Sequence, residues 1–224
     1  MTRSESETWR AYYAATGARA PRATLLIALD RFAAEGADAG KLHALDLGCG
    51  SGRDAVELLA RGWSVLAIDA EPAAIEALRQ RPEITASAQS RLETRVARFE
   101  AAQWPRVDLV NASFALPLVP PAAFAGLWRR IVASLKPGGR FAGQLYGERD
   151  GWAGDPTITF FSRSQVEALL AGLEVEHLLE EEDDSVTPRG APKHWHIFHV
   201  VARKPHDRAK EGSTTDSTKD TAAG

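Results

Sequence analysis

Hydrophobic residues gather along the middle of the chain in short runs that alternate with stretches of helical periodicity. The runs are rich in Val, Ile, Leu and Phe, and they predict strands at residues 43–47, 64–69, 92–99, 107–113 and 140–146. Apolar positions at helical spacing predict helices at residues 53–61, 72–79 and 122–135. This alternation is typical of an α/β protein in which right-handed crossovers build a parallel sheet with helices on both faces.

The pattern changes in the last third of the chain. A helix is predicted at residues 164–171 and strands at residues 173–179 and 195–202. The acidic run at residues 180–184 is expected to be a solvated loop between these strands. Because two strands joined without a helix pair antiparallel, the sheet is expected to end as a mixed sheet.

The two ends of the chain have different compositions. Residues 1–40 are expected to form two short helices, the second after Pro21 and the first around an aromatic cluster made of Trp9, Tyr12 and Tyr13. This part is predicted to be a lid over the site, with simple packing on the sheet as the alternative. Residues 205–224 contain no Val, Ile, Leu, Met or aromatic residue and are expected to be a disordered tail. Residues 41–204 form the predicted main domain.

Composition excludes several classes of protein. The 224 residues carry a net charge of -3, which argues against a broad nucleic-acid-binding surface. A single cysteine excludes an intrachain disulfide and any site that needs two thiolates. No apolar run approaches the roughly 20 residues of a membrane span, and the N-terminus lacks the hydrophobic region of a signal peptide. We therefore expect a cytoplasmic protein. Its partner is expected to be a small molecule, and its state a monomer or weak homodimer.

A glycine-rich segment carries the strongest chemical signal. Gly48, Gly50 and Gly52 stand at alternate positions between the first predicted strand and the first helix of the sheet. Glycines there let the backbone approach a ligand closely, and the helix N-terminus offers free amides. Asp69 ends the second strand, where a carboxylate can accept both hydroxyls of a ribose. The combination predicts a site for a nucleoside-containing cofactor rather than a plain turn.

The spacing and one further charge distinguish the possible cofactors. Nicotinamide-binding loops normally space their glycines as GxGxxG, whereas this segment reads GxGxG. Asp46 lies two residues before Gly48, where its charge would suit an ammonium group and oppose a pyrophosphate. Charge complementarity therefore favours S-adenosylmethionine, and a nicotinamide-dependent oxidoreductase stays the less favoured alternative.

Several ordered motifs together resemble a known family. The segments at residues 46–54, 108–111 and 135–141, together with Asp69, look like the successive motifs of class I S-adenosylmethionine-dependent methyltransferases. The resemblance implies a Rossmann-like, seven-stranded mixed sheet with strand order 3-2-1-4-5-7-6 and an antiparallel seventh strand at residues 194–202. Within that class, the chain looks most like the tellurite-resistance and thiopurine-type small-molecule methyltransferases.

The resemblance also implies a set of cofactor-binding residues, namely Asp46, Gly48, Gly50, Asp69, Ala70, Phe99, Glu100 and Asn111. Asp46 is expected near the amino group and the glycines against the methionine portion, with Asp69 on the ribose and Ala70 beside the adenine. Phe99 and Glu100 occupy the place where such enzymes contact the adenine ring and its amine. A solvated surface position is the alternative for Glu100, and a strand-end cap is the alternative for Asn111.

No catalytic residue can be assigned from the sequence. Methyl transfer from a sulfonium is an in-line displacement that depends mainly on positioning and on exclusion of water, so a general base is optional. Four residues are candidates for the acceptor side: Tyr13, Tyr146, His194 and His196. His199 points to the opposite face of its strand, and we expect no metal site. A non-catalytic sensor or scaffold that retains the cofactor remains an alternative function.

Overall fold

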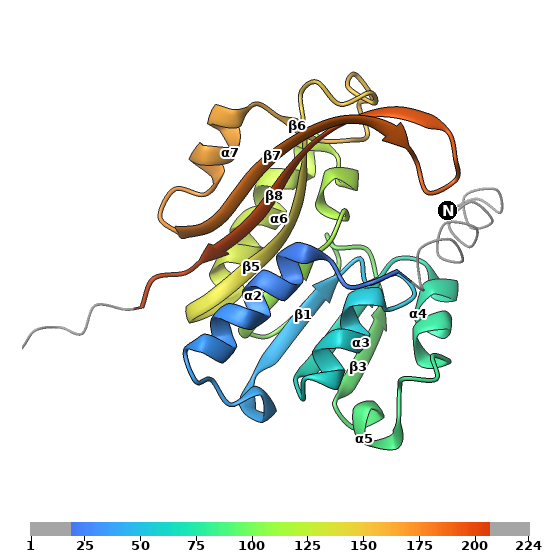
Figure 1. The fold of residues 1–224 in the computed structure, drawn as a ribbon, viewed down its shortest axis with the longest axis vertical. Coiled ribbons are helices and arrows are strands. Elements are labelled where there is room, and N and C mark those ends of the chain that lie inside the picture. Colours follow the sequence, from blue (N-terminus) through green and yellow to red (C-terminus); the bar gives the residue numbers. More distant parts are fainter. Residues whose placement is uncertain (1–18, 207–224) are drawn as a thin grey trace, which may run out of the picture.

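The computed structural model describes residues 19–206, which form a sheet covered by helices on both faces (Figure 1). The strands are β1 His43–Leu47, β2 Ser64–Asp69, β3 Leu92–Val96, β4 Val107–Ala112, β5 Leu135–Gly147, β6 Phe160–Phe161, β7 Glu174–Val186 and β8 Pro192–Arg203. Their order is β3-β2-β1-β4-β5-β8-β7, and β8 runs antiparallel to β5 and β7. The predicted order and mixed sheet are confirmed. The two-residue strand β6, which pairs with the end of β5, was not predicted.

The helices follow the predicted alternation closely. They are α2 Ala23–Ala34, α3 Arg53–Ala60, α4 Pro72–Arg79, α5 Ala86–Gln89, α6 Pro121–Ser134 and α7 Arg163–Leu169, with 3-10 turns at Ala39–Lys41 and Leu116–Leu118. The helix predicted around Trp9, Tyr12 and Tyr13 lies outside the described residues, as does most of the predicted tail. None of the helices within residues 19–206 has the length and apolar character needed to cross a bilayer.

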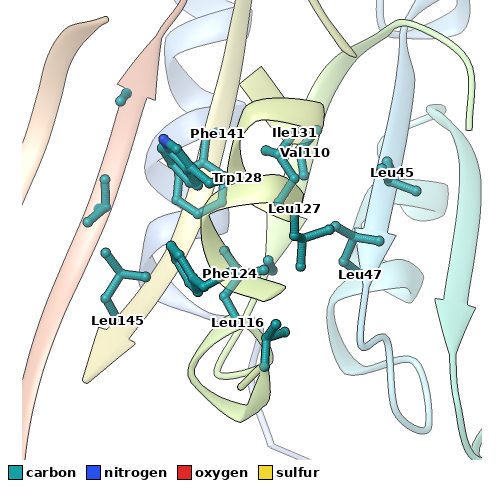
Figure 2. Packing of buried hydrophobic residues seen from close by; sticks show 14 of the residues in the cluster. Leu45, Leu47, Val110, Leu116, Phe124, Leu127, Trp128, Ile131, Phe141 and Leu145 are labelled. Carbon is teal, nitrogen blue, oxygen red and sulfur yellow. The ribbon is translucent and has the colours of Figure 1, made fainter. Parts of the chain in front are cut away.

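Alternation of side chains along the strands gives each face of the sheet its own core. On one face, Leu45, Leu47 and Val110 pack under α6, whose Phe124 and Trp128 are buried against the sheet (Figure 2). On the other face lies a second core between the sheet and α2, α3 and α4. Because Asp46 alternates with Leu45 and Leu47, its side chain lies on the α3 face of the sheet.

The acidic run at residues 180–184 corrects the prediction of a loop, because it belongs to the long strand β7. Its alternate carboxylates meet basic groups that neutralise them. Glu180 and Glu182 both pair with Arg149, and Asp184 Oδ1 lies 2.8 Å from His194 Nδ1. The strand β7 therefore continues to Val186, whereas the sequence pattern predicts that it ends at residue 179.

The buried guanidinium of Arg140 joins the end of α2 to the edge strand β7. Arg140 of β5 is fully buried, and its Nε donates to Glu176 Oε2 at 2.7 Å while Nη1 donates to Glu35 Oε2 at 3.1 Å. Its guanidinium carbon also lies 4.4 Å from the centre of the Phe32 ring. Glu176 reaches Arg140 from an irregularity in the pairing of β7 with β8, between Val175 and His177. The Arg140 pairs fix how α2 packs on the sheet.

Replacement of Arg140 by Ala is expected to lower the free energy of unfolding by about 3 kcal/mol, because it breaks a buried ion-pair group and removes a packed side-chain stem. Chemical denaturation followed by circular dichroism measures the change. Lys41→Ala is the matched control, since Lys41 forms an exposed pair with Asp38 and should cost under about 1 kcal/mol. Equal losses in the two variants would contradict the role given to Arg140.

Candidate cofactor and acceptor site

The carboxyl ends of β1, β2 and β4 meet at one edge of the sheet, and the segment 48–52, here called the glycine loop, turns there from β1 into α3. The amides of Gly48 and Cys49 both donate to the carbonyl of Ile68, at 2.8 and 3.2 Å. The amide of Gly50 donates to Asp69 Oδ2 at 2.9 Å. The loop is therefore bound along its length to the end of β2.

Two positions in the glycine loop require glycine for reasons of space as well as backbone conformation. Gly48 has a φ of 71°, and a Cβ added to it would lie 2.4 Å from the Cβ of Ala115 and 3.3 Å from the ring of Phe99. Gly52 has a φ of 85°, and a Cβ there would lie 2.2 Å from Leu78. Both glycines are therefore packed closely against neighbouring side chains, and the close approach of this backbone to a ligand remains a prediction.

Two carboxylates and one amide form a buried polar group beside the loop. Asn111, at the end of β4, donates from Nδ2 to Asp46 Oδ1 at 2.8 Å and to Asp54 Oδ2 at 3.1 Å. Asp54 also accepts the hydroxyl of Ser113 at 2.6 Å and the backbone amide of Arg22 at 3.0 Å. Asn111 thus links β1, β4 and α3 through its side chain.

Asp46 is the carboxylate in this group with one oxygen left without a hydrogen-bond partner among residues 19–206. It is 2% exposed, and within residues 19–206 its Oδ2 has no hydrogen-bond partner. Burial and the neighbouring Asp54 raise the pKa of Asp46 to about 8, although the bond from Asn111 opposes the shift. A cationic group beside Oδ2 would satisfy this oxygen and favour the ionised carboxylate.

Asp69 and Cys49 are both buried at the glycine loop. Asp69 is 7% exposed, and it accepts the amide of Glu71 at Oδ1, at 2.9 Å, in addition to the amide of Gly50 at Oδ2. The carboxylate therefore orders both the glycine loop and the start of α4. Burial and the charges of Asp46 and Asp69 raise the pKa of the Cys49 thiol, so that it stays neutral and is a poor nucleophile.

The other predicted cofactor-binding residues lie around the same edge. Ala70 is exposed directly after Asp69, and the half-buried ring of Phe99 lies next to Gly48. Glu100 is exposed, and one of its carboxylate oxygens lies 3.8 Å from Arg98 Nε. Arg130 donates to the backbone carbonyls of Phe99 and Glu100, which fixes the turn that carries them.

The four acceptor-side candidates are not brought together. Tyr13 lies outside the described residues, and Tyr146 is buried at the end of β5. His196 is fully buried, accepting the amide of Arg149 at Nδ1 and lying 2.9 Å from Glu180 through Nε2. His194 is bound between Asp184 and Glu182, with Asp184 the main cause of its raised pKa. Both histidines thus stabilise the β7–β8 hairpin.

An aromatic group that the sequence did not single out as a unit lies beyond the ends of β4 and β5. We call it the acceptor-side cluster, and it consists of Arg22, Phe114, Tyr146, Trp152, Trp195 and His199. Phe114 is at its centre, because its ring centroid lies 6.2 to 6.5 Å from those of Tyr146, Trp195 and His199, and the guanidinium carbon of Arg22 lies 4.2 Å above it. Trp152 packs against Tyr146 and Trp195, at 5.9 and 5.6 Å.

Phe114 adopts a backbone conformation that costs energy. Its φ of 55° makes it the one non-glycine residue with positive φ within residues 19–206, and such strain is of order 1–3 kcal/mol. Its amide donates to Gln144 Oε1 at 3.1 Å, and Gln144 Nε2 donates to Thr24 of α2. Nothing in the sequence around Phe114 signals this conformation. Asp54, to which the sequence motifs assign no role, is recognisable as a carboxylate in the first turn of the helix after the loop.

A buried ion pair between Lys193 and Asp150 lies against the aromatic rings of the acceptor-side cluster. Lys193 and Asp150 are both almost fully buried and paired, and the Lys193 ammonium lies 3.8 Å from the ring centre of Trp195 and 4.3 Å from that of Trp152. Burial lowers the pKa of Lys193, while Asp150 acts in the opposite direction. These contacts hold the aromatic rings in position at the end of β5.

Comparison with known proteins connects this geometry to a class of enzyme. Residues 44–139 match the family model described as a methyltransferase domain. A search of curated protein sequences finds no match. Among solved structures, TehB from Haemophilus influenzae is similar with a TM-score of 0.64 and 17% identity, and the match covers 79% of this chain but only 61% of TehB.

Two further solved structures are similar over most of both chains. The magnesium protoporphyrin IX methyltransferase ChlM from Synechocystis PCC 6803, with bound SAH, has a TM-score of 0.65 and 12% identity, covering 90% of this chain and 95% of ChlM. The N-methyltransferase NodS from Bradyrhizobium japonicum WM9, in complex with S-adenosyl-L-homocysteine, has a TM-score of 0.61 and 16% identity, covering 82% and 84%.

Residues 44–139 match a methyltransferase domain, and residues 19–206 have the fold of the class I methyltransferases. The predicted class, the S-adenosylmethionine-dependent methyltransferases, is confirmed by this domain and by the order of the strands. The roles of the individual site residues remain predictions.

Replacement of Gly48 by Ala is expected to destabilise the protein by at least about 1 kcal/mol, because the new Cβ meets Ala115 and the positive φ disfavours alanine. Gly126→Ala is the matched control. Gly126 lies inside α6 with open space around it, so alanine there should stabilise the protein by up to about 1 kcal/mol. Thermal and chemical denaturation measure both changes, and a stabilising Gly48→Ala would contradict the analysis of the loop.

Binding of S-adenosylhomocysteine at pH 7 is expected to release close to one proton. The pKa of Asp46 near 8 keeps its carboxyl protonated in the free protein, and pairing with the ligand's ammonium group favours ionisation. Calorimetry in buffers of different ionisation enthalpy counts the proton. Asp46→Asn should bind without the release, and equal release by both proteins would show that the proton comes from another group.

Proposed function

We propose that this protein transfers the methyl group of S-adenosylmethionine to a small-molecule acceptor. The observation that carries the proposal is the buried, unpartnered oxygen of Asp46 beside a glycine loop with positive φ at each of its three glycines. This arrangement suits a ligand that bears an ammonium group and lies close to the backbone. An ammonium group would favour ionisation of Asp46, whereas a pyrophosphate would oppose it and leave Oδ2 without a cationic partner, so the site favours the sulfonium cofactor over a nicotinamide dinucleotide.

The residues around the loop have matching roles in the proposed complex. Asp46 would receive the amino group, and Gly48 and Gly50 would lie against the methionine portion. Asp69, whose carboxylate also accepts the amides of Gly50 and Glu71, would accept the ribose hydroxyls. Four residues complete the proposed set, in which Ala70, Phe99 and Glu100 would border the adenine and Asn111 would position Asp46.

The acceptor-side cluster is the proposed place for the acceptor. Its rings are half-buried or exposed except for that of Tyr146, and they offer flat apolar surfaces next to the cationic Arg22. ChlM, as its name states, acts on magnesium protoporphyrin IX, a planar molecule. We infer a small acceptor with a planar, unsaturated part that stacks on Phe114 or Trp195.

The bound cofactor supplies an electrophilic methyl group with a neutral thioether as its leaving group. The protein's share is to hold the acceptor in line and to exclude water, which accounts for much of the acceleration in such displacements. Phe114 connects the two halves of this task. It follows Asn111 of the cofactor side by three residues, and its ring lies at the centre of the acceptor-side cluster.

Other expectations belong to the same proposal. Within residues 1–40, α2 packs on the sheet, and we expect the part that carries Trp9, Tyr12 and Tyr13 to cover the site as a lid. We also expect the protein to act as a monomer or weak homodimer in the cytoplasm, and neither nucleic acid nor a membrane to be its partner. Calorimetry with S-adenosylmethionine, S-adenosylhomocysteine and NADH tests the cofactor. An acceptor panel assayed by release of S-adenosylhomocysteine separates an enzyme from a sensor that binds without turnover.

Replacement of Asp69 by Ala is expected to weaken binding of S-adenosylhomocysteine by about 1–3 kcal/mol, the value of charged hydrogen bonds to the ribose. Titration calorimetry measures the affinity, and circular dichroism checks that the fold is retained. Asp38→Ala, an exposed position in the turn before β1, serves as control and should leave affinity unchanged. An unaltered affinity in a folded Asp69→Ala protein would reject the ribose role.

A further inference from the structure

The histidines of β8 point to two different faces of the sheet. His194 and His196 face the side of α7, where Arg149, Glu180 and Glu182 engage them. His199 lies opposite Gln144 in the pairing of β8 with β5, and directly opposed residues share one face. Since Gln144 bonds Thr24 of α2 and the amide of Phe114, His199 lies on the face of the acceptor-side cluster.

The imidazole of His199 has the surroundings of a base. Its side chain is 18% exposed, and its Nε2 lies 3.0 Å from Glu181 Oε2. Burial lowers the pKa of His199. Glu181 acts in the opposite direction, while the nearby charges of His177 and Arg22 add to the lowering. The lowered pKa favours the neutral ring; Nε2 is within ion-pair distance of Glu181 Oε2 but makes no hydrogen bond within residues 19–206, and Nδ1 is the other ring nitrogen.

His199 is connected to the cofactor side through Phe114 and Arg22. The ring centroid of Phe114 lies 6.4 Å from that of His199, and the guanidinium carbon of Arg22 lies 4.2 Å from the centre of the Phe114 ring. The backbone amide of Arg22 donates to Asp54, which shares Asn111 with Asp46. An acceptor stacked on Phe114 would thus lie between the glycine loop and His199.

We propose that His199, which lies within ion-pair distance of Glu181, is the general base that takes the proton of a neutral O–H or N–H acceptor. This inference rests on the proposed function and specifies its acceptor class. The acceptor heteroatom forms a bond to the methyl carbon while the carbon–sulfur bond of the donor breaks, and that electron pair stays on sulfur. The acceptor's proton passes to Nδ1 of His199, and Glu181 stabilises the resulting imidazolium. A thiol acceptor that is already ionised needs no such step.

The test compares paired acceptors in wild-type protein and in His199→Gln. The panel contains catechols and phenols, which keep their proton at pH 7, and matched nitro-substituted thiophenols, which are ionised. His199→Gln should lower kcat for the O–H acceptors at least about a hundredfold, with KM changed by less than about threefold. Activity towards the ionised thiols and affinity for S-adenosylhomocysteine should stay within about threefold. His43→Gln, an exposed histidine at the start of β1, is the matched control.

Glu181→Gln provides a readout that a purely structural role would not move. Because Glu181 raises the pKa of His199, its removal should shift the acid limb of kcat/KM for the O–H acceptors to lower pH. In His199→Gln that limb should disappear.

Two outcomes would overturn the assignment of His199. One is full O–H activity in the Gln variant, and the other is an equal loss with both acceptor types. If S-adenosylhomocysteine binds and no acceptor in the panel is methylated by wild-type protein, the proposed function fails first, and the base assignment fails with it.

Discussion

The side-chain amide of Asn111 donates both of its hydrogens to carboxylates, and the arrangement of the whole site depends on these two bonds. A buried carboxylate without a donor is expensive, and two such groups at close range repel each other. Asn111 offsets part of that cost for Asp46 and Asp54 together. Since the three residues come from β4, β1 and α3, the same bonds align the strand ends from which the glycine loop departs. The remaining Oδ2 of Asp46 has no partner within residues 19–206, so its cost is offset by protonation in the free protein and would be offset by an ammonium group in the proposed complex.

Electrostatics also shapes the other end of the sheet. The long hairpin of β7 and β8 carries a dense row of carboxylates, and a strand of that composition would repel itself if left unpaired. Arg149, Arg163 and His196 converge on Glu180, while Arg149 and His194 lower the pKa of Glu182 to about 2. The charges on this exposed edge strand also discourage edge-to-edge pairing with another chain.

The sequence predicted those parts of the site whose residues lie close together along the chain. The glycine loop, Asp46 before it and Asp69 after the next strand are fixed by short spacings, and the structure gathers these residues at one edge of the sheet. The extent of β7 could not be predicted in this way, because its carboxylates are neutralised by residues on other elements. The irregularity at Val175 and His177 adds to the difficulty, since a shift of one residue turns every following side chain to the other face. The positive φ of Phe114 depends on Gln144, thirty residues later in the chain.

The buried Cys49 gives this protein an internal reporter of loop motion. It is the single cysteine of the chain, it lies between Gly48 and Gly50, and its thiol is covered and held neutral by its surroundings. A thiol reagent therefore reacts at a rate set by how often the glycine loop opens, since the closed loop offers it neither access nor a thiolate. Labelling kinetics with unmodified protein thus yields the free energy of local opening, and the protection gained on adding cofactor measures how firmly the ligand closes the loop.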